Sequence, residues 1–159
     1  MVDKNQAIID FLLQCPQLRS NPLFFNFTEA KDNNKQLLPL ANDKLMNRTF
    51  IDGSVMKRYT FTLIDYRSIA FQAIVNQTGY SNENVEELFD IQGIIDWITL
   101  QAKNKNYPNF GNSCEIEEMT VLTDNPNLNG VDSSTKPSLA KYSFSIRIDY
   151  LDTSERIWN

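Results

Sequence analysis

Residues 142–150 read Tyr-Ser-Phe-Ser-Ile-Arg-Ile-Asp-Tyr, so large apolar residues alternate with small or charged ones. Successive side chains of a β-strand point to opposite faces of the sheet, so this alternation predicts a strand with one buried and one wet face. It is the clearest strand pattern in the chain. The rest of the sequence must therefore supply partner strands and a layer that covers the apolar face.

A hairpin is predicted around Asp52-Gly53. This pair tolerates the positive φ angles that both central positions of a type I′ turn require. In the second arm, residues 55–66, apolar and polar residues alternate, while the first arm, residues 47–51, is short. We therefore expect a second half-buried strand at residues 55–66, with Tyr59, Phe61 and Leu63 on its apolar face.

Two further strands are expected from composition and pattern. Residues 23–28 are rich in Leu, Phe and Thr, and aromatic and β-branched residues favour strands. Residues 114–123 also have strand character, but the alternation slips between Ile116 and Met119. That slip predicts a β-bulge near Glu117-Glu118.

Two main helices are predicted. The first is capped by Asp3, with Gln6 as a capping-box partner, and ends at Pro16. The second is capped by Asn84. Its apolar stripe is spaced to lie across a sheet and consists of Leu88, Ile91, Ile95, Ile98 and Ala102.

Three segments lack a helix or strand period and are expected to be loops. Residues 29–45 are polar with Pro39 in the middle, residues 68–83 show no clean period, and residues 124–137 are rich in Asn, Asp, Ser and Pro. Long loops that a fold does not need often carry function, although a merely tolerated surface loop is about equally frequent.

Together these elements predict one α+β domain over residues 1–159. We expect a mixed, mostly antiparallel sheet of about four to five strands packed against two main helices. No Gly/Ser/Pro linker divides the sequence into two cores.

The charge balance is acidic, with 15 Lys and Arg against 20 Asp and Glu and a net charge of −5. Such a surface repels phosphate backbones and acidic lipid, which argues against independent nucleic-acid binding. The longest apolar runs are far too short to span a bilayer, and the N-terminus has no export signal. We therefore expect a soluble protein made in the cytoplasm.

The residues that usually carry catalysis are scarce. Histidine is absent, which removes the commonest general base and a common metal ligand. Cys15 and Cys114 match no metal spacing and are expected to be free thiols without an activating base. No phosphate-binding glycine motif is present. We therefore expect no enzyme activity and no cofactor.

Two acidic clusters are better explained by solvation than by chemistry. Residues 124–132 offer oxygen ligands near Gly130 but lack the bidentate glutamate of a calcium loop, so a solvated turn is favoured. Glu115, Glu117 and Glu118 are expected on the wet side of their strand. Neither cluster predicts a metal site or an acid–base pair.

Across nearly its whole length the sequence resembles the tail-terminator proteins of siphophages that infect Gram-positive bacteria, a family often labelled minor capsid protein. The resemblance rests on residues 8–16, on Asp52-Gly53-Ser54 leading into residues 57–61, on residues 95–98 through 109–111, and on the Ala140-Lys141-Tyr142 start of the last strand. Residues 68–83 depart from the commoner pattern of the family. These stretches consist mostly of structural residues.

The resemblance implies a mixed sheet flanked by helices, assembled into a ring of about six copies. Such a ring stops polymerisation of the phage major tail tube protein and joins the tail to a head-completion or connector protein. It belongs to the virion and is assembled in the host cytoplasm. DNA would pass through without specific binding, and no membrane or cofactor is involved.

A head-to-tail ring needs two different complementary patches on each subunit. The two long loops are the candidates for these patches. The expected interface residues are Asp124, Asn125, Asn127, Leu128, Asn129, Asp132 and Lys136 in one loop, and Lys35, Leu37 and Leu38 in the other.

Two other classes of function compete with this reading. A small-ligand-binding or regulatory α+β domain would use the helix-covered sheet as one wall of a pocket. A carboxylate enzyme such as a glycosidase would need two inward-facing acids about 5–10 Å apart, and the sequence nominates no such pair.

Overall fold

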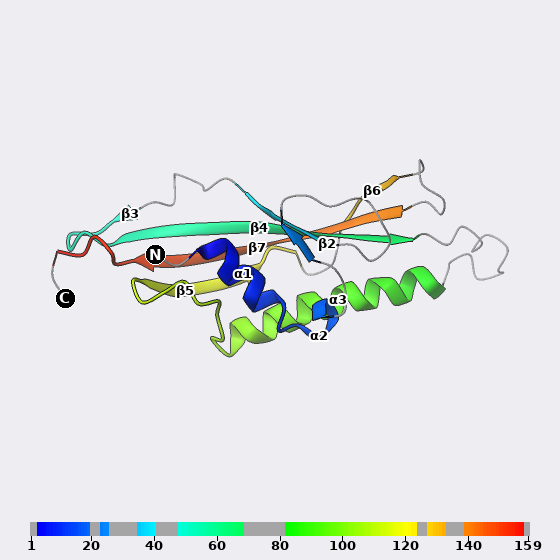
Figure 1. Cartoon of the computed structure of the whole chain (residues 1–159), viewed down its shortest axis with the longest axis horizontal. Helices are drawn as coiled ribbons and strands as arrows, with labels where there is room; N and C mark the ends of the chain where they lie inside the picture. Colours follow the sequence, from blue (N-terminus) through cyan, green and yellow to red (C-terminus); the bar gives the residue numbers. More distant parts are fainter. Residues whose placement is uncertain are drawn as a thin grey trace.

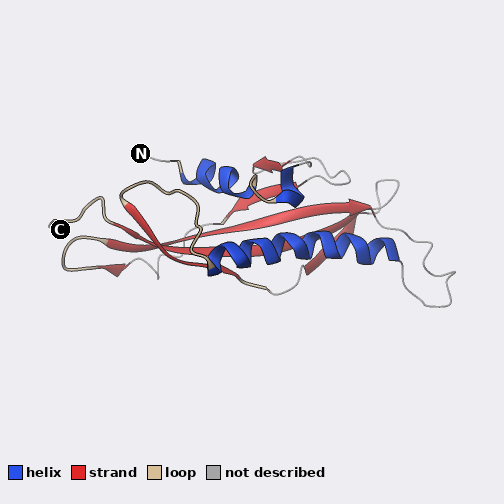
Figure 2. Cartoon of the chain, turned by 90° about the horizontal axis from the view of Figure 1, so that it is seen from below, coloured by secondary structure: helices blue, strands red, loops and turns tan. Residues whose placement is uncertain are grey.

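The computed structural model describes residues 3–19, 23–25, 35–40, 48–68, 82–123, 127–132 and 139–157. In these residues a single sheet is covered on one face by helices (Figures 1 and 2). The fold is therefore α+β, as the sequence predicts. None of the helices it describes is long and apolar enough to cross a membrane.

Two long strands form the centre of the sheet. Strand β4 (Val55–Ser68) and strand β7 (Leu139–Asp152) pair antiparallel over 14 residues, from Val55 opposite Asp152 to Ser68 opposite Leu139. The predicted alternation is confirmed, because the apolar side chains of one parity are buried together. They are Phe61 and Leu63 of β4 and Tyr142, Phe144, Ile146, Ile148 and Tyr150 of β7.

The other strands extend this central pair. The order along the sheet is β1-β2-β4-β7-β5, while β3 pairs with β4 and β6 pairs with β7. All pairs are antiparallel except β1 with β2. The bounds are β1 Leu23–Phe25, β2 Lys35–Pro39, β3 Arg48–Thr49, β5 Cys114–Val121 and β6 Asn127–Asp132.

The first helix differs from its prediction in two details. Helix α1 (Lys4–Leu12) is capped by Asp3, whose carboxylate accepts from the backbone N–H groups of Asn5 and Gln6. Gln6 does not complete a capping box, because its side chain donates to Asp10 at 2.8 Å. Pro16 does not end this helix but begins the short helix α2 (Pro16–Arg19), which suits a residue that lacks an N–H.

Helix α3 (Asn82–Lys103) begins at Asn82, two residues before the predicted cap. Its predicted apolar stripe packs on the sheet, where Ile91, Ile94, Ile95 and Ile98 are buried and Ala102 is partly buried. The side chain of Leu88 lies outside the described part of the chain. The apolar stripe of α3 and helix α1 together form one hydrophobic layer. In this layer the ring centroids of Phe11 and Trp97 lie 5.0 Å apart.

The prediction of an irregular segment at residues 29–45 is wrong for residues 35–39, which form β2. Pro39 obscured this strand, since proline cannot donate to a strand ladder. In the described part of the sheet β1 pairs with residues 35–37, and Pro39 lies beyond this pairing. Similarly, residues 127–132 of the loop predicted at residues 124–137 form β6, a strand of turn-forming residues whose partner among the described strands is β7. The predicted loop at residues 68–83 lies almost entirely outside the described residues.

The predicted bulge in β5 is confirmed, because the register against β7 shifts between Ile116 and Glu118. The hairpin at Asp52-Gly53 is also present, but its turn type is not I′. Gly53 has φ +88°, whereas among the described non-glycine residues only Lys105 has a positive φ. The N–H of Gly53 donates to the carbonyl of Phe50, and the N–H of Phe50 donates to the carbonyl of Ser54. This is a three-residue loop that ends in a glycine bulge.

One buried ionic cluster interrupts the apolar layer. Arg67 donates to both carboxylate oxygens of Asp65, at 2.9 and 3.0 Å, and Lys35 Nζ lies 3.5 Å from Asp65 Oδ2. All three residues are buried, with Lys35 fully enclosed. Burial raises the pKa of Asp65, and the two neighbouring cations act in the opposite direction. The pairing of the Asp65 carboxylate with Arg67 on β4 and Lys35 on β2 therefore offsets part of the free-energy cost of burying these charges.

Replacing Asp65 tests this cluster. Asp65→Asn removes the carboxylate that pairs with two buried cations, and we expect the free energy of unfolding in urea to fall by about 3–5 kcal/mol. The control is Glu118→Gln, which removes an exposed partner of Arg147 and is expected to cost about 1 kcal/mol or less. Equal effects of the two substitutions would contradict a structural role for the buried cluster.

Replacing Gly53 tests the hairpin. A Cβ atom at Gly53 would lie 2.4 Å from the backbone oxygen of Glu155, and the positive φ disfavours any other residue. We expect Gly53→Ala to cost about 1–3 kcal/mol in urea unfolding and to speed amide exchange at Ile157. The control is Gly93→Ala in α3, where the new methyl group meets only the end of the flexible Gln17 side chain. Unchanged exchange at Ile157 in Gly53→Ala would contradict the packing of the C-terminal segment on the hairpin.

Candidate assembly surface

The structure corrects part of the predicted interface. Lys35 and Leu37 are fully buried, because they lie on the helix-covered face of β2 opposite Asp65 and Leu63. They cannot contact a partner in this fold. Leu38 has the opposite parity and is half-buried.

The second predicted interface loop is only partly described. Asn127, Leu128, Asn129 and Asp132 belong to β6, beside the first residues of β7. Their side-chain positions and the residues Asp124, Asn125 and Lys136 lie outside the description. These residues therefore stay predictions.

A different surface stands out at the turn between β3 and β4. Ile51 is 90% exposed at the turn, its neighbour Phe50 is 47% exposed, and Ile157 near the C-terminus is 73% exposed. Water-exposed apolar side chains that gather in one place often mark a site of protein interaction. Sequence reasoning missed this surface, although Phe50-Ile51 directly before a turn was a usable signal.

The C-terminal segment holds this turn in place. The N–H of Ile157 donates to the carbonyl of Asp52 at 2.6 Å, and Arg156 Nε lies 3.0 Å from Asp52 Oδ2. Asp52 also accepts from the N–H and hydroxyl of Ser54. Figure 1 shows the turn and the C-terminal end together at one end of the long axis. The loop that carries Phe50 and Ile51 is therefore held in place by its contacts with the C-terminal segment.

Two carboxylates at this end have lowered pKa values. Hydrogen bonds from the Ser54 side chain and backbone, with the charge of Arg156, lower the pKa of Asp52. Burial acts to raise the pKa of Asp152, but hydrogen bonds from Lys57 and Ser154 hold it well below its usual value. Both groups therefore remain ionised near neutral pH, and the ties to Arg156 and Lys57 persist there.

An open groove of about 610 Å³ continues this apolar surface onto the sheet. Met56 and Leu151 lie in it directly opposite each other on β4 and β7, and Phe50 and Ile51 line its outer end. By strand parity, Met56 shares a face with Arg58, the face turned away from the helices. We call Phe50, Ile51, Met56, Leu151 and Ile157 the tip surface.

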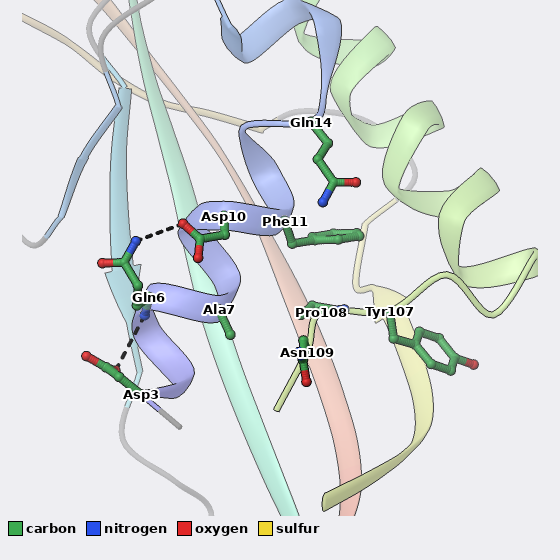
Figure 3. Close-up of a pocket in the computed structure, with 9 residues that line it drawn as sticks. All are labelled: Asp3, Gln6, Ala7, Asp10, Phe11, Gln14, Tyr107, Pro108 and Asn109. Atoms are coloured by element: carbon green, nitrogen blue, oxygen red, sulfur yellow. Dashed lines mark hydrogen bonds between the residues drawn. The ribbon is translucent and has the colours of Figure 1, made fainter. Parts of the chain in front are cut away.

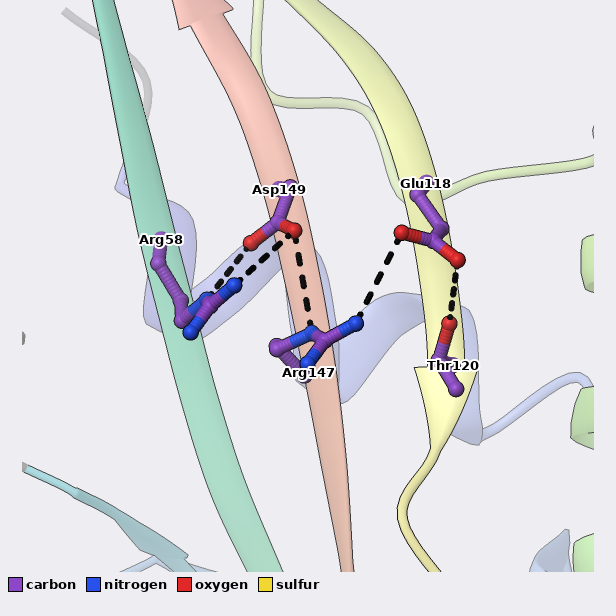
Figure 4. Close-up of polar contacts among 5 residues, drawn as sticks. All are labelled: Arg58, Glu118, Thr120, Arg147 and Asp149. Carbon is purple, nitrogen blue, oxygen red and sulfur yellow. Dashed lines mark hydrogen bonds and ion pairs between the residues drawn. The ribbon is translucent and has the colours of Figure 1, made fainter. Parts of the chain in front are cut away.

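The middle of the same uncovered face is polar and charged. Asp149 accepts from Arg58 at 2.8 and 3.3 Å and lies 3.6 Å from Arg147 Nε, while Arg147 Nη2 lies 3.6 Å from Glu118 (Figure 4). Thr120 donates to the other oxygen of Glu118. Two cations and two anions thus alternate across β4, β7 and β5. This ion ladder is charge-balanced and fixed by cross-strand pairing.

A smaller pocket of about 330 Å³ lies on the helix-covered side, between α1 and residues 107–109 (Figure 3). Its apolar lining comes from Ala7, Phe11 and Pro108. Carboxylates and amides surround this lining, and they are Asp3, Gln6, Asp10, Gln14 and Asn109. We call it the α1 pocket.

The chemical groups considered from the sequence are the acidic residues of β5 and the two cysteines. The described residues contain no group of three His, Cys, Asp or Glu residues placed to hold a metal ion. Glu115, Glu117 and Glu118 are exposed on β5, where strand position predicts them. Cys15 is buried and donates to Gln17 Oε1 at 3.1 Å, Cys114 is half-buried, and neither is in a disulfide.

The aromatic residues belong mainly to the core. Phe110 packs edge-on against Tyr150 at 5.3 Å and against Tyr59 at 6.0 Å between ring centroids. Burial raises the pKa of Tyr59 and of Tyr150 to about 12, so both phenols are neutral near pH 7. These rings fill the space between α1 and the sheet.

Comparison with known proteins finds no matching family model and no curated protein with significant sequence similarity.

Proposed function

We propose that this chain is a structural assembly protein of a siphophage virion. In this proposal about six copies form a ring at the head-proximal end of the tail, where the ring ends polymerisation of the major tail tube protein and contacts a head-completion protein. The role is one of assembly without catalysis. It starts from the sequence resemblance to tail terminators, and the α+β architecture agrees with that resemblance.

The observation that carries the proposal is the tip surface. A single chain leaves Ile51 at the β3–β4 turn and Ile157 on the C-terminal segment largely in water, and Asp52 ties these two segments together. Exposing such side chains has a free-energy cost of roughly 25 cal/mol per Å² of apolar surface, which association with another protein would recover. A subunit of a ring needs surfaces of this kind.

The ion ladder supports the proposed relation to DNA. Its two cations, Arg58 and Arg147, are each paired with a carboxylate, and the whole chain carries −5. Binding to phosphate backbones depends on cations that are available to replace counterions. A ladder that is already neutralised, on an acidic protein, suits passage of DNA without tight binding.

The α1 pocket favours the second candidate, a small-ligand-binding domain without catalysis. Its volume of about 330 Å³ is at the lower end of the range for ligand sites, and it lies open at the surface. Ligand sites usually enclose most of the ligand, so this pocket supports the second candidate less well than the tip surface supports assembly.

The proposal is tested by mixing the purified protein with the polymerising tail tube protein encoded beside it. We expect tubes of limited length, each with a ring of the protein at one end in negative-stain electron microscopy. Light scattering should show the ring either in the free protein or only when tubes are present, since some rings form only on their template. Bovine serum albumin is the control for nonspecific effects on tube growth.

A chain that stays monomeric with and without tubes, and leaves tube length unchanged, contradicts the tail-terminator proposal. Saturable binding of a small molecule that protects Gln14 and Tyr107 from solvent would then favour the ligand-binding candidate.

A further inference from the structure

Two surfaces of this chain have the properties of a matching pair. On the tip surface the side chain of Ile51 is 90% exposed at the turn, and the α1 pocket is a recess of limited size. We infer that the tip surface of one copy docks into the α1 pocket of the next copy, with Ile51 as the anchor. This inference rests on the proposed ring and names the contact that would build it.

The chemistry of the two surfaces is complementary at the anchor, while Asp52, paired with Arg156, and Glu117 line the adjoining groove. Ile51 and Phe50 present apolar side chains, and Arg48, two residues before Phe50, is exposed on β3. The α1 pocket has an apolar lining and carries two carboxylates, Asp3 and Asp10. An aliphatic anchor fits the lining, and a cation beside the anchor meets the acidic rim.

The size of the α1 pocket also favours one protruding side chain as its occupant. A volume of about 330 Å³ is small for a drug-sized ligand but sufficient for a branched aliphatic side chain and part of its neighbour. Figure 3 shows Ala7 and Phe11 of α1 on the side of the pocket opposite residues 107–109, with the Gln14 side chain beside the Phe11 ring. Anchor residues in protein interfaces typically fill pockets of this kind.

The positions of the two surfaces predict head-to-tail addition of copies. The groove part of the tip surface lies on the uncovered face of the sheet, whereas the α1 pocket lies on the helix-covered side. Both lie in the half of the molecule that contains the N- and C-terminal ends (Figure 1). Because the two patches differ and lie on opposite faces of the sheet, one copy adds to the next head to tail. A head-to-tail contact with little translation closes into a ring, whereas a larger translation gives a filament.

The test uses two variants that each disable one side of the contact. Ile51→Asp places a charge on the anchor, and Gln14→Trp fills the α1 pocket from its exposed rim. We expect each variant alone to lose rings on tubes and to associate about tenfold or more weakly than the original protein. Leu100→Asp is the matched control, since Leu100 is also an exposed apolar residue, but on α3. It should form rings normally.

Mixing the two disabled variants gives the sharpest result. The intact pocket of the Ile51→Asp chain can accept the intact tip of the Gln14→Trp chain, so the mixture should form dimers that stop at one contact. Sedimentation velocity measures this species, and urea unfolding of each variant verifies that it is folded.

The outcomes separate this inference from the proposed function. If the original protein forms rings and Ile51→Asp forms them equally well, the docking inference is wrong and the ring proposal stands. If Ile51→Asp forms rings but no longer binds tubes, the tip belongs to an axial contact and the inference is again wrong. If the original protein forms no rings at all, both fail.

Discussion

The continuous pairing of β4 with β7 is the constraint on which the rest of the molecule depends. Fourteen residue pairs without an interruption fix the parity of both strands along their whole length. A slip of one residue would move every apolar side chain of one strand to the wet face. The helices can therefore cover only one side, and everything described on the other side follows from the same register.

The register also places unlike surfaces at defined positions along the two strands. Toward one end, Asp65 and Arg67 lie on the covered face and are neutralised within the core. In the middle of the uncovered face, Arg58 stands directly opposite Asp149. At the other end, Met56 stands opposite Leu151 beside an exposed turn. One long strand pair thus carries a buried charge cluster, a balanced ladder and an apolar end.

The sequence predicted the elements whose pattern is local. The alternation of apolar and polar residues predicted β4 and β7, and a break in that alternation predicted the bulge in β5. The side-chain oxygen of Asp3 predicted the N-cap of α1. The sequence-based prediction failed where tertiary contacts decide the structure. β2 contains Pro39 and a lysine, and it forms a strand because β4 pairs with it along its whole length. The tip surface was missed for a similar reason, since Ile157 and Ile51 are brought together only by the tie at Asp52.

The edge of the sheet at β5 has a consequence for how copies can meet. β5 is the last strand in the sheet order of the described residues, and it carries Glu115, Glu117 and Glu118, all exposed. Two such edges brought together would align like charges at close range, which is a common protection against uncontrolled strand addition. Charge repulsion along the β5 edge disfavours polymerisation by strand pairing between sheets. Any ordered association is thereby directed to surfaces other than the strand edge.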